Sequence, residues 1–255
     1  MRIAETLFLL GAICSLGATR QTDNFTIHAA NQTLADGAAA LAEQYRHDLA
    51  DQWFEGKLPS WSTRCIVTID HEAEHPAGRT TFSMDDGRRI ANLRIVVKGS
   101  LDDVLYAVLP HEITHVVFAT HFGNSLPRWA DEGAAILAEG EPQQWRQRMM
   151  AADLLSSRRE LSLPVLMGMR EYPKNDDGMT AVYVQGFSLV EFLVHDKGKP
   201  QFIVFLREAN RQGWDRAVKK SYGDASIGEL ETRWKTWVGE KRQEQKAKPG
   251  KRRWA

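Results

Sequence analysis

Cysteine, net charge and long apolar runs are all scarce in this sequence of 255 residues. The two cysteines are Cys14 and Cys65. Because Cys14 lies in an N-terminal segment that we expect to be removed, the mature chain keeps only Cys65. A single cysteine excludes an intramolecular disulfide and a zinc site built from thiolates. We expect Cys65 to be a small buried side chain at the start of a strand.

The charges cancel, with 33 Lys and Arg against 33 Asp and Glu. No global field therefore steers the protein to nucleic acid or to an anionic membrane, and we expect neither as a partner. A content of 43% hydrophobic and 26% charged residues is that of a globular protein. A chain of this size can bury one substantial core or two lobes.

Only the N-terminus contains an extended apolar run, Leu7 to Ala18, and no later run reaches the roughly 18 residues that span a membrane. A basic start, an apolar stretch and small residues at its end are the layout of a secretory signal peptide. The bulky Ile13 before Cys14 fits a lipoprotein cleavage site poorly. We expect residues 1–18 to be removed and the mature protein to be secreted or to lie in the periplasm or cell envelope, without a membrane span.

Residues 19–99 read as an N-terminal lobe of strands and one helix. Val, Ile and Thr at alternating positions predict strands, and apolar residues at helical spacing predict an amphipathic helix. The strands are expected at 24–30, 64–70, 79–84 and 89–97, and the helix at 34–54. Asp86-Gly87 favours a hairpin between the last two strands. The strand at 89–97 is expected to be an edge strand, which is either purely structural or an open edge for an extended peptide.

The chain beyond residue 100 is helical in pattern. Ser100 and Asp103 resemble a capping box that opens a helix. Further helices are predicted at 142–156, 182–195, 199–212 and 227–239, and residues 241–255 read as a basic disordered tail. These patterns predict an α+β fold in which a small N-terminal sheet precedes a mostly helical C-terminal lobe.

The sequence HEITH, residues 111–115, contains the clearest chemical signal. His111 and His115 are four residues apart, so on a helix both imidazoles can reach one metal ion. Glu112 beside them can contact water at that ion. This H-E-x-x-H pattern is typical of zinc hydrolases. A metal also explains ionisable groups in an apolar helix, because burying such groups without partners costs several kcal/mol.

A catalytic zinc takes three protein ligands and leaves one position for water. His121 is one candidate for the third ligand, at the spacing found in metzincins, with Met167 or Met169 as the methionine of a Met-turn. In that pattern a glycine lets the helix turn sharply, and this chain has Phe118 there. Phenylalanine resists a backbone conformation with φ > 0, which counts against His121.

Glu132 is the other candidate and the favoured one. It lies near the start of a second helix, where negative charge is stabilised. Gly123-Asn124 and Pro127 supply a turn between the two helices, which makes them antiparallel and brings a carboxylate to the two imidazoles. His121 then lies at the end of its helix, where an imidazole can hydrogen-bond to the last carbonyl groups of the helix.

HEITH together with WADEGAA, residues 129–135, resembles the gluzincins, the peptidase MA-like zinc peptidases that include thermolysin and the aminopeptidase N family. In these proteins H-E-x-x-H is followed by a glutamate ligand in W-x-x-E-G-x-A. The segment YVQGFSLVEFLV, residues 183–194, is similar to an aminopeptidase N segment whose tyrosine stabilises the oxyanion. The resemblance covers roughly residues 104–238.

The resemblance implies a zincin-like fold in which residues 100–240 hold the zinc-binding helices and helical lobe of one catalytic domain. It implies one Zn²⁺ bound by His111, His115 and Glu132. It further implies that Glu112 is the general base toward a zinc-activated water and that Tyr183 donates to the oxyanion. Glu139 matches an acidic position of the aminopeptidase N helix and is either a partner that orients a ligand imidazole or an exposed carboxylate at a helix end. Asp131 is likewise either such a partner or a favourable charge at the start of its helix.

The chain departs from the aminopeptidases in one informative place. Their G-x-M-E-N stretch, which grips the amino terminus of the substrate, is missing, and RIANLRIVVKG, residues 89–99, occupies its position. The expected function is therefore that of a secreted zinc metallopeptidase acting on peptides or proteins, without an aminopeptidase grip. The alternatives are an inactive peptidase-like binding protein, or a zinc hydrolase of another amide or ester.

Overall fold

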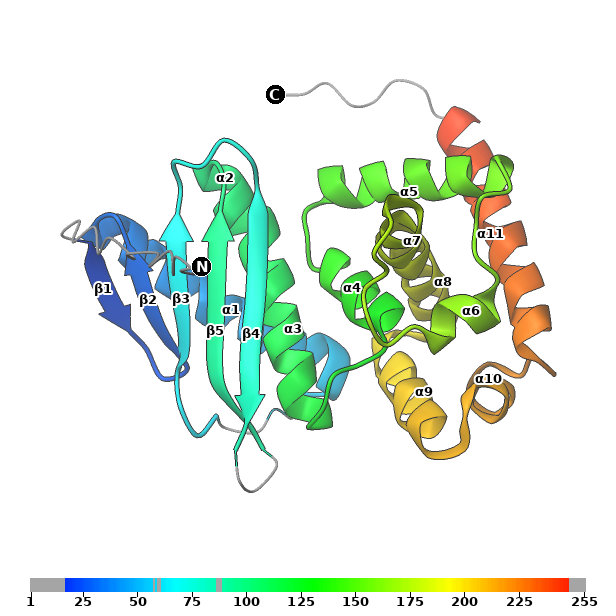
Figure 1. Cartoon of the computed structure of the whole chain (residues 1–255), viewed down its shortest axis with the longest axis horizontal. Helices are drawn as coiled ribbons and strands as arrows, with labels where there is room; N and C mark the ends of the chain where they lie inside the picture. The colour runs from blue at the N-terminus through cyan, green and yellow to red at the C-terminus, as the bar shows by residue number, and fades with distance from the viewer. Residues whose placement is uncertain (1–16, 57, 59–60, 86–88, 248–255) are drawn as a thin grey trace, which may run out of the picture.

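The computed structural model describes residues 17–56, 58, 61–85 and 89–247. Most of the expected signal peptide, the Asp86-Gly87 turn and residues 248–255 lie outside these described residues. A five-stranded sheet forms one half of the molecule, and helices form the other (Figure 1). This arrangement confirms the predicted α+β class.

The sheet has the strand order β1-β2-β3-β5-β4. Strands β2, β3 and β5 run parallel, and the outer strands β1 and β4 pair antiparallel with β2 and β5. Val67 of β3 lies opposite Ile27 of β2 and Ile95 of β5, so these apolar side chains share the buried face. The strands are β1 (Ala18–Gln21), β2 (Phe25–Ala29), β3 (Cys65–Asp70), β4 (Ala77–Met84) and β5 (Ile90–Lys98). Of these, β1 had not been predicted.

The prediction that the strand at 89–97 is an edge strand is wrong. This strand is β5, and it pairs with β3 on one side and β4 on the other. Leu93, Ile95 and Val97 of β5 are buried, whereas the residues of β4 are almost all exposed. Burial of an alternating apolar face stabilises β5 in the interior of the sheet, which leaves β4 as the edge strand.

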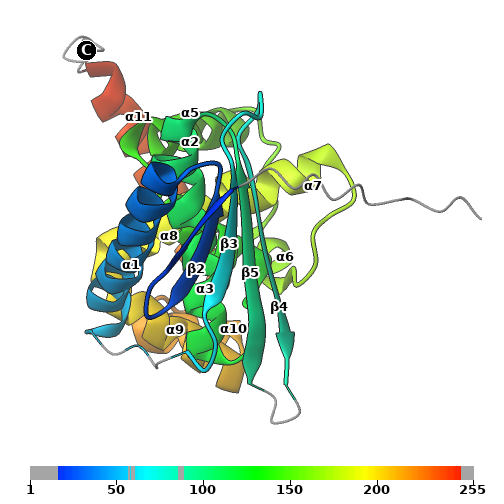
Figure 2. The same cartoon turned by 90° about the vertical axis from the view of Figure 1, so that its left-hand side faces the viewer.

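One face of the sheet is covered by α1 (Gln32–Phe54) and α3 (Leu109–Phe122), as Figure 2 shows. The side chain of Asn31 caps α1 by accepting a hydrogen bond of 2.9 Å from the N–H of Leu34. Trp53 of α1 packs edge-on against Phe118 of α3 and Phe202 of α9 (Lys199–Gln212), at centroid distances of 5.2 Å and 5.9 Å. These aromatic contacts join the sheet half and the helical half in one core.

The helical part begins as predicted. Ser100 accepts a hydrogen bond of 3.2 Å from the N–H of Asp103 and donates one of 2.6 Å to its carboxylate. From there α2 (Leu101–Asp103) and the π-helical turn η1 (Val104–Val108) lead directly into α3. A short turn then leads to α4 (Arg128–Ile136).

The remaining helices match the predicted ranges to within a few residues, with two differences. The helix expected to end at Gly239 continues to Ala247, so residues 241–247 are helical where a disordered tail had been expected. Three short helices, α6, α7 and α10, had not been predicted. The elements are α5 (Glu141–Ser156), α6 (Leu163–Gly168), α7 (Asp176–Thr180), η2 (Ala181–Gln185), α8 (Gly186–Lys197), α9 (Lys199–Gln212), α10 (Trp214–Tyr222) and α11 (Ile227–Ala247). Within the described ranges, no helix combines the length and the apolarity that a membrane span requires.

Candidate metal centre

Helix α3 presents His111 and His115 on the same face, with their ring centroids 4.9 Å apart. The helix ends at Gly123, whose φ of 68° lets its N–H bond back to the carbonyl of Ala119 at 2.9 Å. This ending allows the chain to reverse into α4, which runs back alongside α3. The reversal brings the first turns of α4 to the histidine face of α3.

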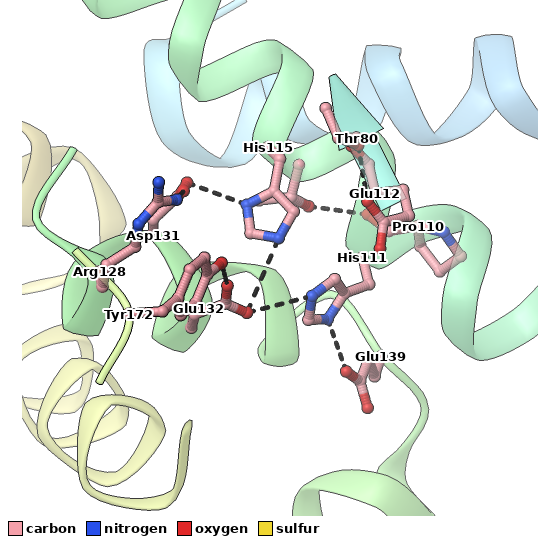
Figure 3. A network of polar contacts seen from close by, with 11 residues as sticks. Thr80, Pro110, His111, Glu112, His115, Arg128, Asp131, Glu132, Glu139 and Tyr172 are labelled. Atoms are coloured by element: carbon pink, nitrogen blue, oxygen red, sulfur yellow. Dashed lines mark hydrogen bonds and ion pairs between the residues drawn. The ribbon is translucent and has the colours of Figure 1, made fainter. Parts of the chain in front are cut away.

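Glu132 of α4 points directly at the two imidazoles (Figure 3). Its side chain is only 1% exposed, and its Oε2 lies 3.4 Å from Nε2 of His111 and 3.8 Å from Nε2 of His115. All three donor atoms lie within 4.8 Å of one another. Glu132 Oε2 is buried and accepts no hydrogen bond from any described group. Two imidazole nitrogens and a carboxylate oxygen left without a donor fit the ligand set of a catalytic zinc.

The charges around these three residues favour a cation between them. Burial opposes ionisation of Glu132, but His115, His111 and the Tyr172 hydroxyl together lower its pKa to about 2. Burial likewise disfavours a charged imidazole, but the neighbouring carboxylates raise the pKa of His111 to about 10 and that of His115 to about 9. Without a metal, both imidazoles therefore hold a proton near neutral pH. A bound metal ion would supply this positive charge in place of the protons.

Each imidazole also meets a carboxylate through its other nitrogen. Nδ1 of His111 lies 2.7 Å from Oε1 of Glu139, in a hydrogen bond. Nδ1 of His115 lies 3.0 Å from Oδ1 of Asp131. These contacts leave both Nε2 atoms directed at Glu132, which is the arrangement that orients imidazole ligands in metal sites.

His121 does not belong to this cluster. Its ring lies against Phe54, at a centroid distance of 4.0 Å, and its Nε2 contacts the guanidinium of Arg207 on α9. Met167, suggested above for a Met-turn, is buried on α6. The geometry therefore favours Glu132 over His121 as the partner of the two histidines.

The side chain of Glu112, on α3, contacts the edge strand β4. Thr80 donates a hydrogen bond of 2.6 Å to Oε2 of Glu112 and also lies 3.1 Å from its backbone carbonyl oxygen. A Cβ at position 78 would overlap the Glu112 carboxylate, so Gly78 is what allows this close approach. Sequence reasoning missed Thr80, because a threonine in an exposed strand gives no distinctive signal.

Tyr183 lies in the η2 turn and stacks on Tyr172, with ring centroids 6.4 Å apart and planes 14° apart. Tyr172 was not predicted. It donates a hydrogen bond to Oε1 of Glu132, and the guanidinium of Arg128 lies 4.3 Å from its ring centre. Burial and the charge of Glu132 raise the pKa of Tyr183 to about 12, so its hydroxyl stays protonated near neutral pH. Tyr172 is in an irregular segment between α6 and α7, where no periodic pattern marks it.

These groups open onto one cavity of about 450 Å³. Edge strand β4 forms one wall with residues 78–82, and the two tyrosines lie on another. The cavity therefore places an accessible strand edge beside a cluster of candidate metal ligands.

Two glycines allow close packing of the elements that carry Glu132 and Tyr183. A Cβ on Gly133 of α4 would lie 2.5 Å from the carbonyl oxygen of Gly186, and one on Gly186 would lie 2.6 Å from that of Trp129. Because these contacts are with backbone, the neighbouring atoms have little freedom to move. The glycines that follow Glu132 and Tyr183 in the two motifs thus let α4 approach η2 and α8 closely.

We expect Gly186→Ala to destabilise the protein by about 1–3 kcal/mol, because the added methyl group overpacks this crossing. Unfolding in urea, followed by circular dichroism, measures the change. Gly37→Ala is the control, since Gly37 lies within α1 and a Cβ there meets nothing within 4 Å. That substitution is expected to be neutral or to stabilise by about 0.5–1 kcal/mol. Equal urea midpoints for the wild type and Gly186→Ala would contradict the close packing.

Comparison with known protein families relates the chain to one of them by sequence. A family model described as Peptidase MA superfamily matches residues 94–240. The matched range begins in β5, contains α3, α4, η2 and α8, and ends in α11. No curated protein and no solved structure matches the chain.

Proposed function

The chain belongs to the peptidase MA superfamily, and from this membership we propose that it is a zinc metallopeptidase of the gluzincin type that cleaves peptides or proteins. The observation that carries the proposal is the convergence of His111, His115 and Oε2 of Glu132, a buried oxygen that accepts no hydrogen bond from any described group. We further propose that the mature protein acts outside the cytoplasm, as a secreted or cell-envelope protein, on the basis of the N-terminal sequence.

The donor set supports a catalytic rather than a structural zinc. Structural zinc sites usually fill all four positions with protein ligands, commonly cysteines. The candidate group among the described residues has three members and contains no cysteine. In the proposed site His111, His115 and Glu132 would hold the ion, and all three also line the cavity.

A bound zinc ion supplies a Lewis acid that polarises the scissile carbonyl and lowers the pKa of an attacking water. Glu112 is proposed to accept the proton of that water and to deliver it to the leaving amine. Thr80 fixes the Glu112 carboxylate for this task through the 2.6 Å hydrogen bond. Since Glu112 is only 5% exposed, the proton transfer is shielded from bulk water.

Tyr183 is proposed to donate a hydrogen bond to the oxyanion. Its raised pKa keeps the proton on the phenol, as a donor requires. Tyr172 is less suited to this role, because its hydroxyl already donates to Glu132. A single donor to an oxyanion typically contributes about 3 kcal/mol to stabilisation of the transition state.

The free side of β4 is proposed to bind the substrate backbone. Among the strands that the structure describes, β4 pairs only with β5, and residues 78–82 line the cavity next to Glu112. An extended peptide can add to such an edge by β-augmentation, which places its carbonyl groups along the cavity. The peptide-binding role considered above for the strand at 89–97 is therefore proposed for β4.

Removal and return of zinc tests the proposal. The purified protein is expected to contain about one zinc per chain and to cut a mixed peptide library. 1,10-Phenanthroline is expected to abolish cleavage, and one equivalent of zinc to restore it, both read by mass spectrometry of the products. Cleavage that persists after the metal is gone would contradict the proposal. Tight zinc binding without cleavage would instead support an inactive binding protein, and turnover of other amides or esters alone would support a different zinc hydrolase.

A further inference from the structure

A second cavity, of about 310 Å³, adjoins the proposed catalytic cavity and has three arginines among its otherwise neutral lining residues. Arg170, Arg207 and Arg211 lie on its wall together with His121. No aspartate or glutamate is among its lining residues. Since the chain has as many acidic as basic residues, this local excess of positive charge does not follow from composition.

The three arginines lack acidic partners among the described residues. Some arginines elsewhere in the protein are compensated: Arg148 lies 2.7 Å from Glu191, and Arg233 lies 2.7 Å from both Asp196 and Asp224. Arg207 instead contacts the ring of His121. Burial, and the charge of Arg207, lower the pKa of His121 to about 4, so this imidazole is neutral near pH 7 and the positive charge of the cavity comes from the arginines.

The two cavities adjoin each other at lining residues that they share. Ser125 and Leu126, in the turn between α3 and α4, line both. The N–H of Arg128, just after this turn, donates a hydrogen bond of 3.2 Å to the carbonyl of Met169. That bond holds the turn against the segment in which Arg170 lines the second cavity and Tyr172 lines the first. The second cavity therefore lies next to the first, beside the turn between α3 and α4.

We propose that this second cavity is a subsite that binds a carboxylate of the peptide substrate and makes the enzyme selective for acidic peptides. The inference rests on the proposed peptidase function. Guanidinium groups bind carboxylates through paired, charge-assisted hydrogen bonds, and three of them around one cavity favour an anion strongly. The carboxylate comes from an aspartate or glutamate side chain or from the C-terminus of the substrate.

Calorimetric titration of the full chain, with zinc chelated to prevent cleavage, tests the subsite. The probes are a glutamate-containing peptide with an amidated C-terminus, its glutamine counterpart, and the glutamine peptide with a free C-terminal carboxylate. The glutamate peptide is expected to bind at least about tenfold more tightly than the amidated glutamine peptide, with a preference that weakens in high salt. Tight binding of the third peptide instead would identify the C-terminal carboxylate as the ligand.

Arg170→Gln combined with Arg211→Gln is expected to reduce this preference to about twofold or less, because two of the three guanidinium groups are lost. Both side chains are exposed, so the protein should fold normally. The matched control is Arg94→Gln with Arg146→Gln, which removes two exposed arginines that line neither cavity and should keep the preference.

Equal affinity of wild-type protein for all three peptides, or equal loss in both double variants, would overturn the subsite. A cleavage assay of the zinc-loaded protein tests the proposed peptidase function separately from the subsite. Cleavage without acidic preference would leave the peptidase standing and remove the subsite. A preference for acidic peptides in binding, without any cleavage, would leave the subsite standing and remove the peptidase.

Discussion

Glu132→Ala is expected to empty the metal site, lowering the zinc content from about one per chain to a small fraction of that. The substitution removes one of three donors and the carboxylate whose charge balances the imidazoles of His111 and His115. Loss of a ligand from a three-ligand site also leaves a second position open to water, which weakens binding further. Elemental analysis after dialysis against metal-free buffer measures the zinc directly.

His121→Ala is the matched control for the choice between ligand schemes. Its imidazole packs on Phe54 and contacts Arg207, away from the cluster, so the variant should retain its zinc. Asp131→Asn serves a second purpose, because it keeps the shape of the side chain but removes the charge 3.0 Å from Nδ1 of His115. We expect this variant to bind zinc about 10–100-fold more weakly without losing the site. Zinc retained by Glu132→Ala but lost from His121→Ala would refute the proposed ligand set.

The parts of the site that sequence could predict are those fixed by spacing along one element. His111 and His115 share a helical face because they are four residues apart, whatever surrounds them. Glu132 follows a recognisable turn, so its approach to α3 could also be inferred. Whether these three residues act as ligands remains a prediction that zinc analysis will decide.

Thr80 and Tyr172 could not be predicted, because their roles depend on tertiary contacts. Thr80 reaches Glu112 only because β4 is the edge of the sheet and lies against α3. The alternation of polar and apolar residues predicted the strands but left their order in the sheet open. Tyr172 reaches Glu132 from an irregular segment that has no periodicity to read.

Motif glycines illustrate a further limit of sequence reasoning. Gly133 and Gly186 follow the proposed ligand and the proposed oxyanion donor in the chain, which suggests roles in binding. The structure shows them instead at a crossing of backbones, where a methyl group would meet a carbonyl oxygen. Their part in the site is indirect, since they set how closely α4 approaches η2.

Glu112→Gln is expected to lower kcat by a factor of about 10²–10⁴, the range that general acid–base groups contribute, with the zinc content unchanged. The carboxamide has nearly the shape of the carboxylate and can still accept the hydrogen bond of Thr80 through its oxygen, so the fold should be preserved. It cannot accept a proton from water near neutral pH. Steady-state rates on a peptide that the wild type cleaves, with zinc analysis of the same samples, make the measurement.

Glu74→Gln provides the matched control, since this exposed glutamate precedes β4 and does not line the cavity. It should turn over substrate at the rate of the wild type. A Glu112→Gln variant that contains zinc and remains fully active would show that the proton is accepted elsewhere. Parallel loss of zinc and activity would instead show that Glu112 shapes the metal site. Activity lost while zinc is retained is the result that separates a base from a ligand, because Glu112 faces the cavity but does not belong to the three-residue cluster.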